Sequence, residues 1–342
     1  MSLVGMPTVP AGESTQMTTL LNALKENVQI LQAQIKDLSV NQKTLQNQSS
    51  NTPITTTIQY YPTNGTWSTI NSINNARLTN AGCGSVTSAL CIGGVATAFL
   101  STVENFNGTA WSTLSGGISV AKNWISAAGT ASSALAYGGY NGSAQSGVDS
   151  FNGSSWTTGT GLPVTTWQMA GFGSSNTSAF MAGGISSSGI TSSTYTYNGT
   201  VWNSSASMPS SICTMGGCGT SAAGLVCGGY PNLANTYIYN GTTWSAVSSL
   251  SLGRECLSVS GGTNTDCISV GGNDSSYMYN KTEYFNGSTW AATGNLVTTI
   301  SRFGISGNTV TNNVGAITMG GGTDVAGSTY TAICQLFTTP HS

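Results

Sequence analysis

Apolar residues recur in the first part of the chain with the spacing of a coiled-coil seam. The steps between them alternate between three and four residues. The seam positions are Leu21, Leu24, Val28, Leu31, Ile35, Leu38, Gln42 and Leu45. Two seam residues in seven form a narrower stripe than a helix buries on a globular core, so the pattern predicts self-association. A single amphipathic helix on the protein's own core is the alternative.

The seam composition bears on the number of strands in this coiled coil. Val28 and Ile35 alternate with leucines, which favours a dimer, whereas Gln42 fixes the register without deciding the count. Dimer and trimer therefore both stay open. A polar tract follows Leu45 and ends at Pro53, which cannot continue a helix, so a linker is expected there.

Beyond the linker, short mixed runs replace the heptads and two markers each occur six times. One is Asn-Gly followed by Trp, at steps of 42 to 46 residues: Trp67, Trp111, Trp156, Trp202, Trp244 and Trp290. The other is a glycine pair closing an apolar run, beginning at Gly93, Gly138, Gly183, Gly228, Gly271 and Gly320. Units of this length with several strands and turns are typical of β-propeller blades.

Each marker predicts a local structure. The Asn-Gly dipeptides indicate type I′ hairpin turns, because both residues tolerate positive φ. An aromatic residue precedes the Asn in five of the six units and is expected to pack on one face of the sheet: Phe106, Phe151, Tyr197, Tyr239 and Phe285. The glycine pair is expected to end an inner strand where backbones converge and no side chain fits.

The order of the markers predicts how the ring closes. Each glycine pair precedes a marker Trp by 16 to 19 residues, except the last, where Phe337 follows instead. Trp67 has no glycine pair before it. We therefore expect residues 57–70 to complete the sixth blade with residues 316–337, which leaves no open sheet edge.

Composition limits the partners. Charged residues are 5% of the chain and the net charge is −2, so neither nucleic acid nor an anionic membrane is an expected partner. The 39% hydrophobic content supplies the burial that disordered chains lack. No apolar run is long enough to span a membrane, and the N-terminal region lacks the pattern of a Sec signal peptide.

The eight cysteines are too sparse for a disulfide scaffold and lack the spacing of a zinc finger. They are predicted to be mostly buried thiols. Cys83 and Cys91, like Cys218 and Cys227, flank a hairpin, so a cross-strand bridge stays open there. We expect no metal and no cofactor.

The glycine pair, the later aromatic residue and Trp, and a basic residue opening the next strand together resemble the kelch repeat. The basic residues are Arg77, Lys122, Arg254 and Arg302, and units opening near Thr166 and Ser211 lack one. The resemblance covers residues 55–338. It implies a mostly β fold, a six-bladed kelch-like β-propeller preceded by an N-terminal α-helical coiled coil. WD40 repeats fit poorly, because no Trp-Asp or Gly-His dipeptide occurs.

The chain is thus expected to have five segments. They are a docking arm at 1–16, a coiled-coil oligomerisation stalk at 17–47, a linker at 48–55, the propeller at 56–338 and a tail at 339–342.

Residues for catalysis are missing from the pattern. The one histidine is His341 in the tail, so the copper ligands of kelch-fold oxidases are absent. The acidic residues Glu104, Asp149, Glu255, Asp266, Asp274, Glu283 and Asp324 are spread over several units, without the facing pair of a glycosidase. Arg77, Arg254 and Arg302 are interpreted as one structural repeat position. We expect no catalytic residue and no enzymatic activity.

Aromatic residues that depart from the repeat are the candidate ligand-binding residues. Trp124 and Trp167 belong to no marker, and Tyr140 and Tyr230 follow glycine pairs at one end of the ring. Exposed aromatic rings among Asn and Ser suit sugar stacking with hydrogen bonding. Filling of gaps between blades is the alternative role for the two tryptophans.

The low-charge unit rich in Ser, Thr and Ala is also similar to kelch-like arrays in tail, fibre and other virion surface proteins of bacteriophages. This resemblance implies a virion structural protein, assembled in the host cytoplasm and displayed as a fibre, knob or capsid decoration. Its expected partners are its own copies through the coiled coil, other virion proteins through the arm, and host-surface glycan. A cellular kelch-type protein-interaction scaffold is the alternative.

Overall fold

The computed structural model describes residues 65–310 and 313–339. All described residues belong to one compact unit, Gln59–Ser342. The predicted docking arm, coiled coil and linker lie outside the described residues, as do residues 340–342 of the tail.

The described residues form antiparallel β-sheet without a helix. Sheet 1 contains β2 (Ala81–Gly84), β3 (Ala89–Ile92), β4 (Val103–Phe106) and β5 (Trp111–Thr113). Sheet 2 contains β6 (Ser126–Thr130), β7 (Ser133–Tyr137), β8 (Val148–Phe151) and β9 (Trp156–Thr158). Sheet 3 contains β11 (Ala170–Ser175), β12 (Ser178–Ala182), β15 (Thr194–Tyr197) and β16 (Trp202–Ser205).

The second half of the described chain repeats this plan. Sheet 4 contains β17 (Gly216–Thr220), β18 (Ala223–Cys227), β19 (Thr236–Tyr239) and β20 (Trp244–Val247). Sheet 5 contains β21 (Ser258–Thr263), β22 (Asp266–Val270), β23 (Thr282–Phe285) and β24 (Trp290–Ala292). Sheet 6 contains β25 (Gly304–Val310), β26 (Asn313–Gly322), β27 (Tyr330–Thr338) and β1 (Thr66–Ile70). A small additional sheet joins β10 (Thr166–Trp167), β13 (Ile185–Ser186) and β14 (Gly189–Ile190).

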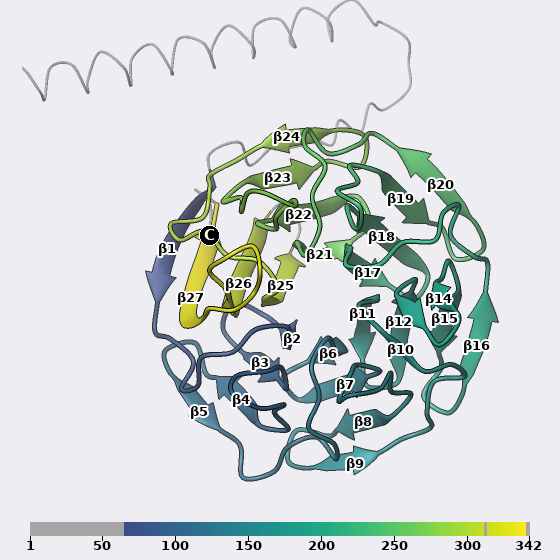
Figure 1. The fold of residues 1–342 in the computed structure, drawn as a ribbon, viewed down its shortest axis with the longest axis vertical. Coiled ribbons are helices and arrows are strands. Elements are labelled where there is room, and N and C mark those ends of the chain that lie inside the picture. Colours follow the sequence, from purple (N-terminus) through teal and green to yellow (C-terminus); the bar gives the residue numbers. More distant parts are fainter. Residues whose placement is uncertain (1–64, 311–312, 340–342) are drawn as a thin grey trace, which may run out of the picture. The chain divides into compact units, whose positions relative to one another are not determined.

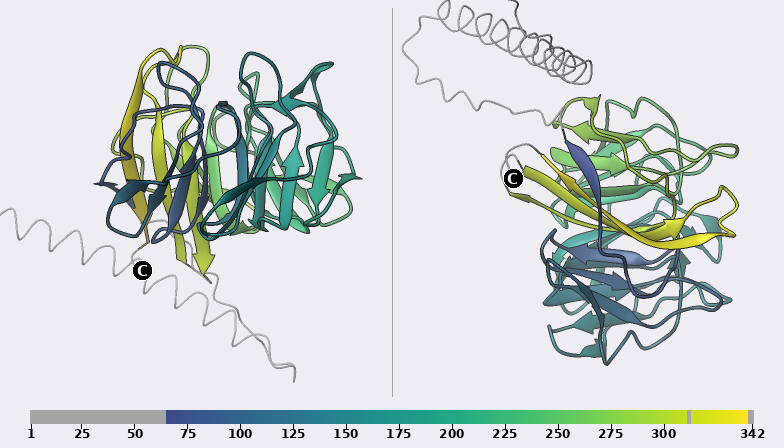
Figure 2. Two further views of the ribbon diagram at one scale, coloured as in Figure 1. Left: turned by 90° about the horizontal axis from the view of Figure 1, so that it is seen from below. Right: turned by 90° about the vertical axis from the view of Figure 1, so that its left-hand side faces the viewer.

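The six four-stranded sheets are arranged as a closed ring (Figure 1). The first strand of each sheet lies nearest the centre and contacts the first strand of the next sheet, in the cyclic order β2, β6, β11, β17, β21, β25 and back to β2. The connections between second and third strands project from one face of the ring (Figure 2). We call this face the loop face.

The hydrophobic cores lie between neighbouring sheets. One core joins Leu90 and Ile92 of β3 to Ala134 and Phe151 of sheet 2, for example. The second strand of each sheet is the most apolar, and all four residues of β3 are buried because both faces are covered. One sheet therefore cannot bury its own surface, and the ring is stabilised collectively.

The predicted closure is confirmed for residues 66–70. Strand β1 pairs antiparallel with β27, and Trp67 lies opposite Phe337. Their ring centroids are 5.2 Å apart. The first strand of the described chain, β1, is thus the outer strand of sheet 6, whose other three strands come from the end of the described chain.

The same aromatic contact recurs in the other five sheets, which confirms the expected packing of the residue before Asn. Ring centroids lie 4.9–5.2 Å apart in the pairs Phe106–Trp111, Phe151–Trp156, Tyr197–Trp202, Tyr239–Trp244 and Phe285–Trp290. Each pair closes the hairpin of the third and fourth strands.

The prediction of type I′ turns in these hairpins is wrong. Four residues separate Phe106 from Trp111, and only Gly108 among them has positive φ, at 93°. The side-chain Oδ1 of Asn107 accepts hydrogen bonds from the backbone N–H groups of Thr109 and Ala110 at 3.0 and 2.9 Å. Asn is therefore needed here for its side chain, as in an Asx turn, and not for a left-handed backbone.

The glycine pairs hold adjacent sheets together. Gly139 has φ of 103°, and a Cβ there would lie 2.8 Å from the carbonyl oxygen of Asn123. Its N–H donates to the carbonyl of Thr166, which leads into sheet 3, at 2.9 Å. The second glycine of every pair makes the equivalent bond, to Lys122, Thr166, Ile212, Arg254, Ile300 and, across the closure, Arg77. The expected convergence of backbones is confirmed.

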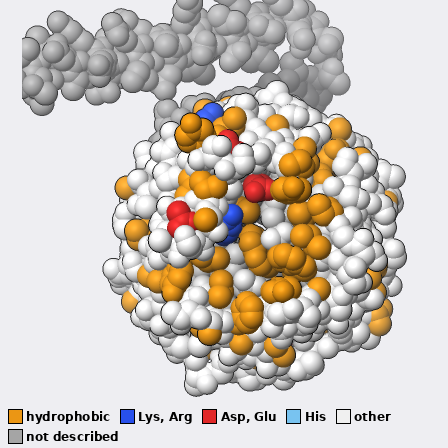
Figure 3. Space-filling model, viewed as in Figure 1, with side chains coloured by type: hydrophobic (Ala, Val, Ile, Leu, Met, Phe, Trp, Pro, Cys, Tyr) orange, Lys and Arg blue, Asp and Glu red, His pale blue; other side chains and the backbone are white. Residues whose placement is uncertain are grey.

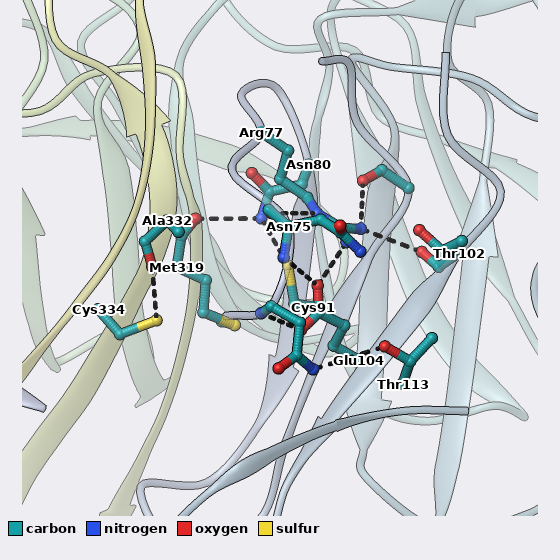
Figure 4. Close-up of polar contacts among 12 residues, drawn as sticks. Asn75, Arg77, Asn80, Cys91, Thr102, Glu104, Thr113, Met319, Ala332 and Cys334 are labelled. Atoms are coloured by element: carbon teal, nitrogen blue, oxygen red, sulfur yellow. Dashed lines mark hydrogen bonds and ion pairs between the residues drawn. The ribbon is translucent and has the colours of Figure 1, made fainter. Parts of the chain in front are cut away.

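Three basic residues that open repeat units form buried ion pairs. Arg77 Nη2 lies 2.5 Å from Glu104 Oε1, and Arg77 also donates to the carbonyls of Asn75, Gly93 and Thr102 (Figure 4). The equivalent pairs are Lys122–Asp149 at 3.7 Å and Arg254–Glu283 at 2.6 Å. All six side chains are at most 2% exposed, so these acids and bases stabilise the sheets.

All eight cysteines are buried free thiols, as predicted. Leu90 lies opposite Cys83 and Gly82 opposite Cys91. Because neighbouring strand residues point to opposite faces, Cys83 and Cys91 face different sides of sheet 1, which is the wrong geometry for a cross-strand bridge.

Candidate functional site

Six residues other than glycine adopt left-handed backbone at equivalent positions just before the first strand of each sheet. They are Thr79, Trp124, Gln168, Thr214, Cys256 and Arg302, with φ between 48° and 56°. Such residues are uncommon because Cβ crowds the backbone, and they concentrate where surrounding structure holds a functional site. We call these six residues the mouth ring.

Backbone hydrogen bonds connect the mouth ring around the axis. Thr79 donates to Arg302, Arg302 to Cys256, Cys256 to Thr214 and Thr214 to Gln168, over 2.6–3.0 Å. Trp124 donates to Thr79 at 2.9 Å. The backbone at the axis is therefore fixed by sheet-to-sheet bonds, while the side chains at these positions vary freely in type.

The mouth ring lies at one end of an axial channel. The channel itself is lined by small residues of the first strands, such as Gly82, Ala127 and Gly171, and encloses about 190 Å³. On the loop face a cavity of about 240 Å³ opens, which we call the mouth cavity. It is lined by Trp124, Gln168, Ile185, Ile190, Cys213, Thr214, Tyr230, Glu255, Cys256 and Arg302. Figure 3 views this face and shows hydrophobic side chains gathered around a central hollow.

The structure brings the predicted aromatic residues to this face. The rings of Trp124 and Trp167 meet edge to face with centroids 6.4 Å apart, and Tyr140 lies 5.0 Å from Trp167. All three side chains are half-buried. Tyr230 is 51% exposed and lines the mouth cavity together with Trp124.

Their positions follow from the repeat. Trp124 is a mouth-ring residue, whereas Tyr140 and Tyr230 directly follow glycine pairs. The backbone of Tyr140 bridges to Asn123, and Tyr230 N–H donates to the carbonyl of Cys213. These bonds hold both tyrosines beside residues adjoining the mouth ring.

The lining of the mouth cavity also includes three polar or charged side chains, Gln168, Glu255 and Arg302, which we call the polar wall. Arg302 is half-buried, and its Nη1 donates only weakly to Ser301 Oγ, at 3.4 Å. Glu255 is also half-buried, and its Oε2 is a buried atom without a hydrogen-bond partner among the described residues. Burial raises the pKa of Glu255, and the positive charge of Arg302 partly offsets this effect.

The two thiols in the cavity wall are poor nucleophiles. Burial raises the pKa of Cys213 to about 11, with a further contribution from the charge of Glu255. Burial likewise raises the pKa of Cys256 to about 12, against the opposing charge of Arg302. Both remain protonated at neutral pH, whereas nucleophilic cysteines require thiolate.

Sequence reasoning missed the polar wall and misplaced Arg302. Gly272 donates to Ile300, so Ile300 and not Arg302 is the equivalent of Arg77 and Arg254. Arg302 lies two residues later, in the mouth ring. The sequence could have shown this, because Arg302 lies two residues after Ile300, just as Trp124 lies two residues after Lys122.

No protein-family model matches this chain, and no curated protein matches its sequence. Within residues 65–310 and 313–339, no helix is long and apolar enough to cross a membrane. The same residues contain no group of three or more His, Cys, Asp or Glu side chains placed to hold a metal ion.

Proposed function

We propose that this chain carries a six-bladed kelch-like β-propeller that works as a non-enzymatic recognition domain, with its ligand at the mouth cavity. The observation that carries the proposal is the convergence of Trp124, Trp167, Tyr140 and Tyr230 on one face of the ring. Six four-stranded sheets in a closed cycle support the propeller assignment.

A glycan is the ligand class that this arrangement favours. Aromatic rings provide flat apolar surfaces for the C–H faces of sugars, and a few polar groups at the same cavity orient hydroxyls. Trp124 and Tyr230 supply the apolar surface, and Gln168, Glu255 and Arg302 supply the polar groups.

Binding without turnover is favoured by the state of the reactive groups. Glu104, Asp149 and Glu283 are committed to buried ion pairs. The thiols at the cavity are protonated, and Glu255 is the sole carboxylate lining it among the described residues. Hydrolysis of a glycoside requires two facing carboxylates or an activated nucleophile, and the described lining of the mouth cavity provides neither.

We further propose that the protein is a virion fibre, knob or decoration subunit. In this proposal the heptad segment makes it a homo-oligomer, the N-terminal arm docks on other virion proteins, and the propeller attaches to host-surface glycan. Support comes from the heptads, the low charge and the resemblance to phage kelch-like arrays.

Two experiments test these proposals. A glycan array probed with the intact chain should show binding that Trp124→Ala and Trp167→Ala weaken, and unchanged binding in both variants would refute the site. Electron microscopy with labelled antibody should locate the protein on purified particles. Its occurrence only in soluble cytosolic complexes would refute the virion assignment.

A further inference from the structure

Arg302 and Glu255 are two opposite charges that line one cavity without forming an ion pair. Both lie in the wall of the mouth cavity, yet no described carboxylate is within 4.0 Å of the Arg302 guanidinium. The other buried charge pairs of the ring are in direct contact, at 2.5–3.7 Å. At the mouth, the Arg302 guanidinium and the Glu255 carboxylate therefore both line the cavity without a charged partner in direct contact among the described residues.

Neutral polar groups lie beside these two charges. The amide of Gln168 makes no hydrogen bond within the described chain, although its residue belongs to the mouth ring. Thr214 Oγ1 donates to its neighbour, the carbonyl of Cys213, at 2.7 Å. The cavity thus combines one strong donor, one strong acceptor and an amide that offers both.

We propose that the mouth cavity binds a neutral pyranose through two hydroxyls on adjacent carbons. One hydroxyl donates to Glu255 and its neighbour accepts from Arg302, while the sugar's C–H face stacks on Trp124 or Tyr230. A diol suits this pair because each hydroxyl is both donor and acceptor, and charged partners strengthen such bonds. This inference rests on the proposed glycan-binding function and names its ligand class.

The charge balance argues against an acidic sugar. Glu255 offsets Arg302 within the cavity, so a carboxylate on the ligand would meet no net positive field. Two further carboxylates, Asp274 and Asp324, lie on the loop face in the β22–β23 and β26–β27 connections. Hydrogen bonds within these loops lower the pKa of both, so both are negatively charged at neutral pH.

The test is titration of the intact chain with methyl glycosides of glucose, galactose and mannose and with the corresponding uronic acids. We expect at least one neutral glycoside to bind at least tenfold more tightly than its uronic acid. Glu255→Gln and Arg302→Met should each weaken that binding about tenfold or more, which is the usual effect of losing a hydrogen bond to a charged group. Arg302→Lys keeps the charge without the fork and should weaken it less.

The possible results separate the inference from the proposed function. Preference for a uronic acid, or neutral binding that tolerates both Glu255→Gln and Arg302→Met, would overturn the inference while glycan binding stands. Sugar binding that survives Trp124→Ala, Tyr230→Ala and both charge variants would place the ligand elsewhere and overturn the proposed site as well. Unfolding curves identify any variant that fails to fold. If Arg302→Met does not fold, the affinity of the charge-preserving Arg302→Lys is compared with wild type in its place.

Discussion

Trp67 and Phe337 come from opposite ends of the described chain and lie opposite each other across the β1–β27 ladder, with ring centroids 5.2 Å apart and ring planes tilted by 49°. Trp67 Nε1 also donates to Thr282 Oγ1 in the neighbouring sheet at 2.9 Å. This one side chain therefore contributes both to the closing sheet and to its contact with sheet 5.

Removal of Trp67 should destabilise the whole ring. We expect Trp67→Ala to lower the free energy of unfolding by about 3–5 kcal/mol, because a large buried aromatic is replaced by a cavity. Trp67→Phe should lower the free energy of unfolding by about 1–3 kcal/mol, because it leaves the buried Thr282 Oγ1 without its hydrogen bond from Trp67. Urea denaturation measures both, with Val201→Ala at an exposed turn as a control expected to stay within about 0.5 kcal/mol. A wild-type midpoint in Trp67→Ala would mean that closure does not stabilise the ring.

The glycine pairs allow a matched test of backbone convergence. Gly139 and Gly142 have nearly the same φ, 103° and 107°, but only a Cβ at Gly139 would meet backbone. Gly142→Ala should cost about 1–2 kcal/mol for the left-handed backbone alone. Gly139→Ala should cost about 1–3 kcal/mol more, through overpacking against Asn123. Equal losses of unfolding free energy in the two variants would contradict the role of the pair in joining sheets.

The ion pair of Arg254 and Glu283 should make stability depend on acidity. Burial opposes ionisation of Glu283, but the hydrogen bond and charge of Arg254 outweigh it and lower its pKa. A lowered folded-state pKa contributes stability above the unfolded value, near 4.5, that is lost as the pH falls through the folded value. Wild type should therefore lose more stability between pH 7 and pH 3 than Glu283→Gln does.

Glu255→Gln provides the control of opposite sign. Because burial raises the pKa of Glu255, this group favours the folded state below its folded pKa and opposes it at neutral pH. Glu255→Gln should thus gain unfolding free energy relative to wild type as the pH rises from 3 to 7. If the two variants showed the same pH dependence, these assignments would be wrong.

Ligand binding should depend on the protonation of Glu255. A sugar hydroxyl donates to the ionised carboxylate, so affinity should fall as the pH drops through the raised pKa of Glu255. The other charged or titratable side chains that line the cavity are Arg302, Cys213, Cys256 and Tyr230. Burial raises the pKa of both thiols, so neither changes its protonation between pH 7 and pH 4. Titration calorimetry from pH 7 to pH 4 should show this fall in wild type and a flat profile in Glu255→Gln. A fall of the same size in Glu255→Gln would assign the effect to another group.

Sequence periodicity predicted the ring because it reports on side chains that pack in every unit. The marker Trp packs within its own sheet, and the glycine pair joins that sheet to the next one. The order of these two markers along the chain was enough to predict that β1 pairs with β27. The repeat position of Arg77 and Arg254 was interpreted as structural, but the ion pairs themselves were not predicted. The partner acids lie on the third strand of each sheet, more than 25 residues later in the chain, so only the folded sheet brings each pair together.

The mouth ring could not be found in the same way. Its left-handed backbone is imposed by hydrogen bonds between sheets, and it accepts residues as different as Trp124, Cys256 and Arg302. No residue type marks it, so the aromatic wall was predicted only because Trp124 and Trp167 depart from the repeat. The polar wall, with Glu255 and Gln168, carried no such signal.

The turn prediction failed for a related reason. Asn-Gly is compatible both with a two-residue turn and with a longer loop capped by the Asn side chain. The pairing of Phe106 with Trp111 leaves four residues between the strands, and this register, which tertiary packing of the aromatic pair stabilises, selects the second structure.

The most direct test of the account is the affinity of the intact chain for the best glycan from the array, compared between Trp124→Ala and Tyr277→Ala by titration calorimetry. Tyr277 is 67% exposed in the β22–β23 loop and lies outside the mouth cavity, so it is a matched aromatic control. We predict at least a tenfold loss of affinity in Trp124→Ala and none in Tyr277→Ala. Unchanged affinity in Trp124→Ala, or equal losses in both, would contradict recognition at the mouth.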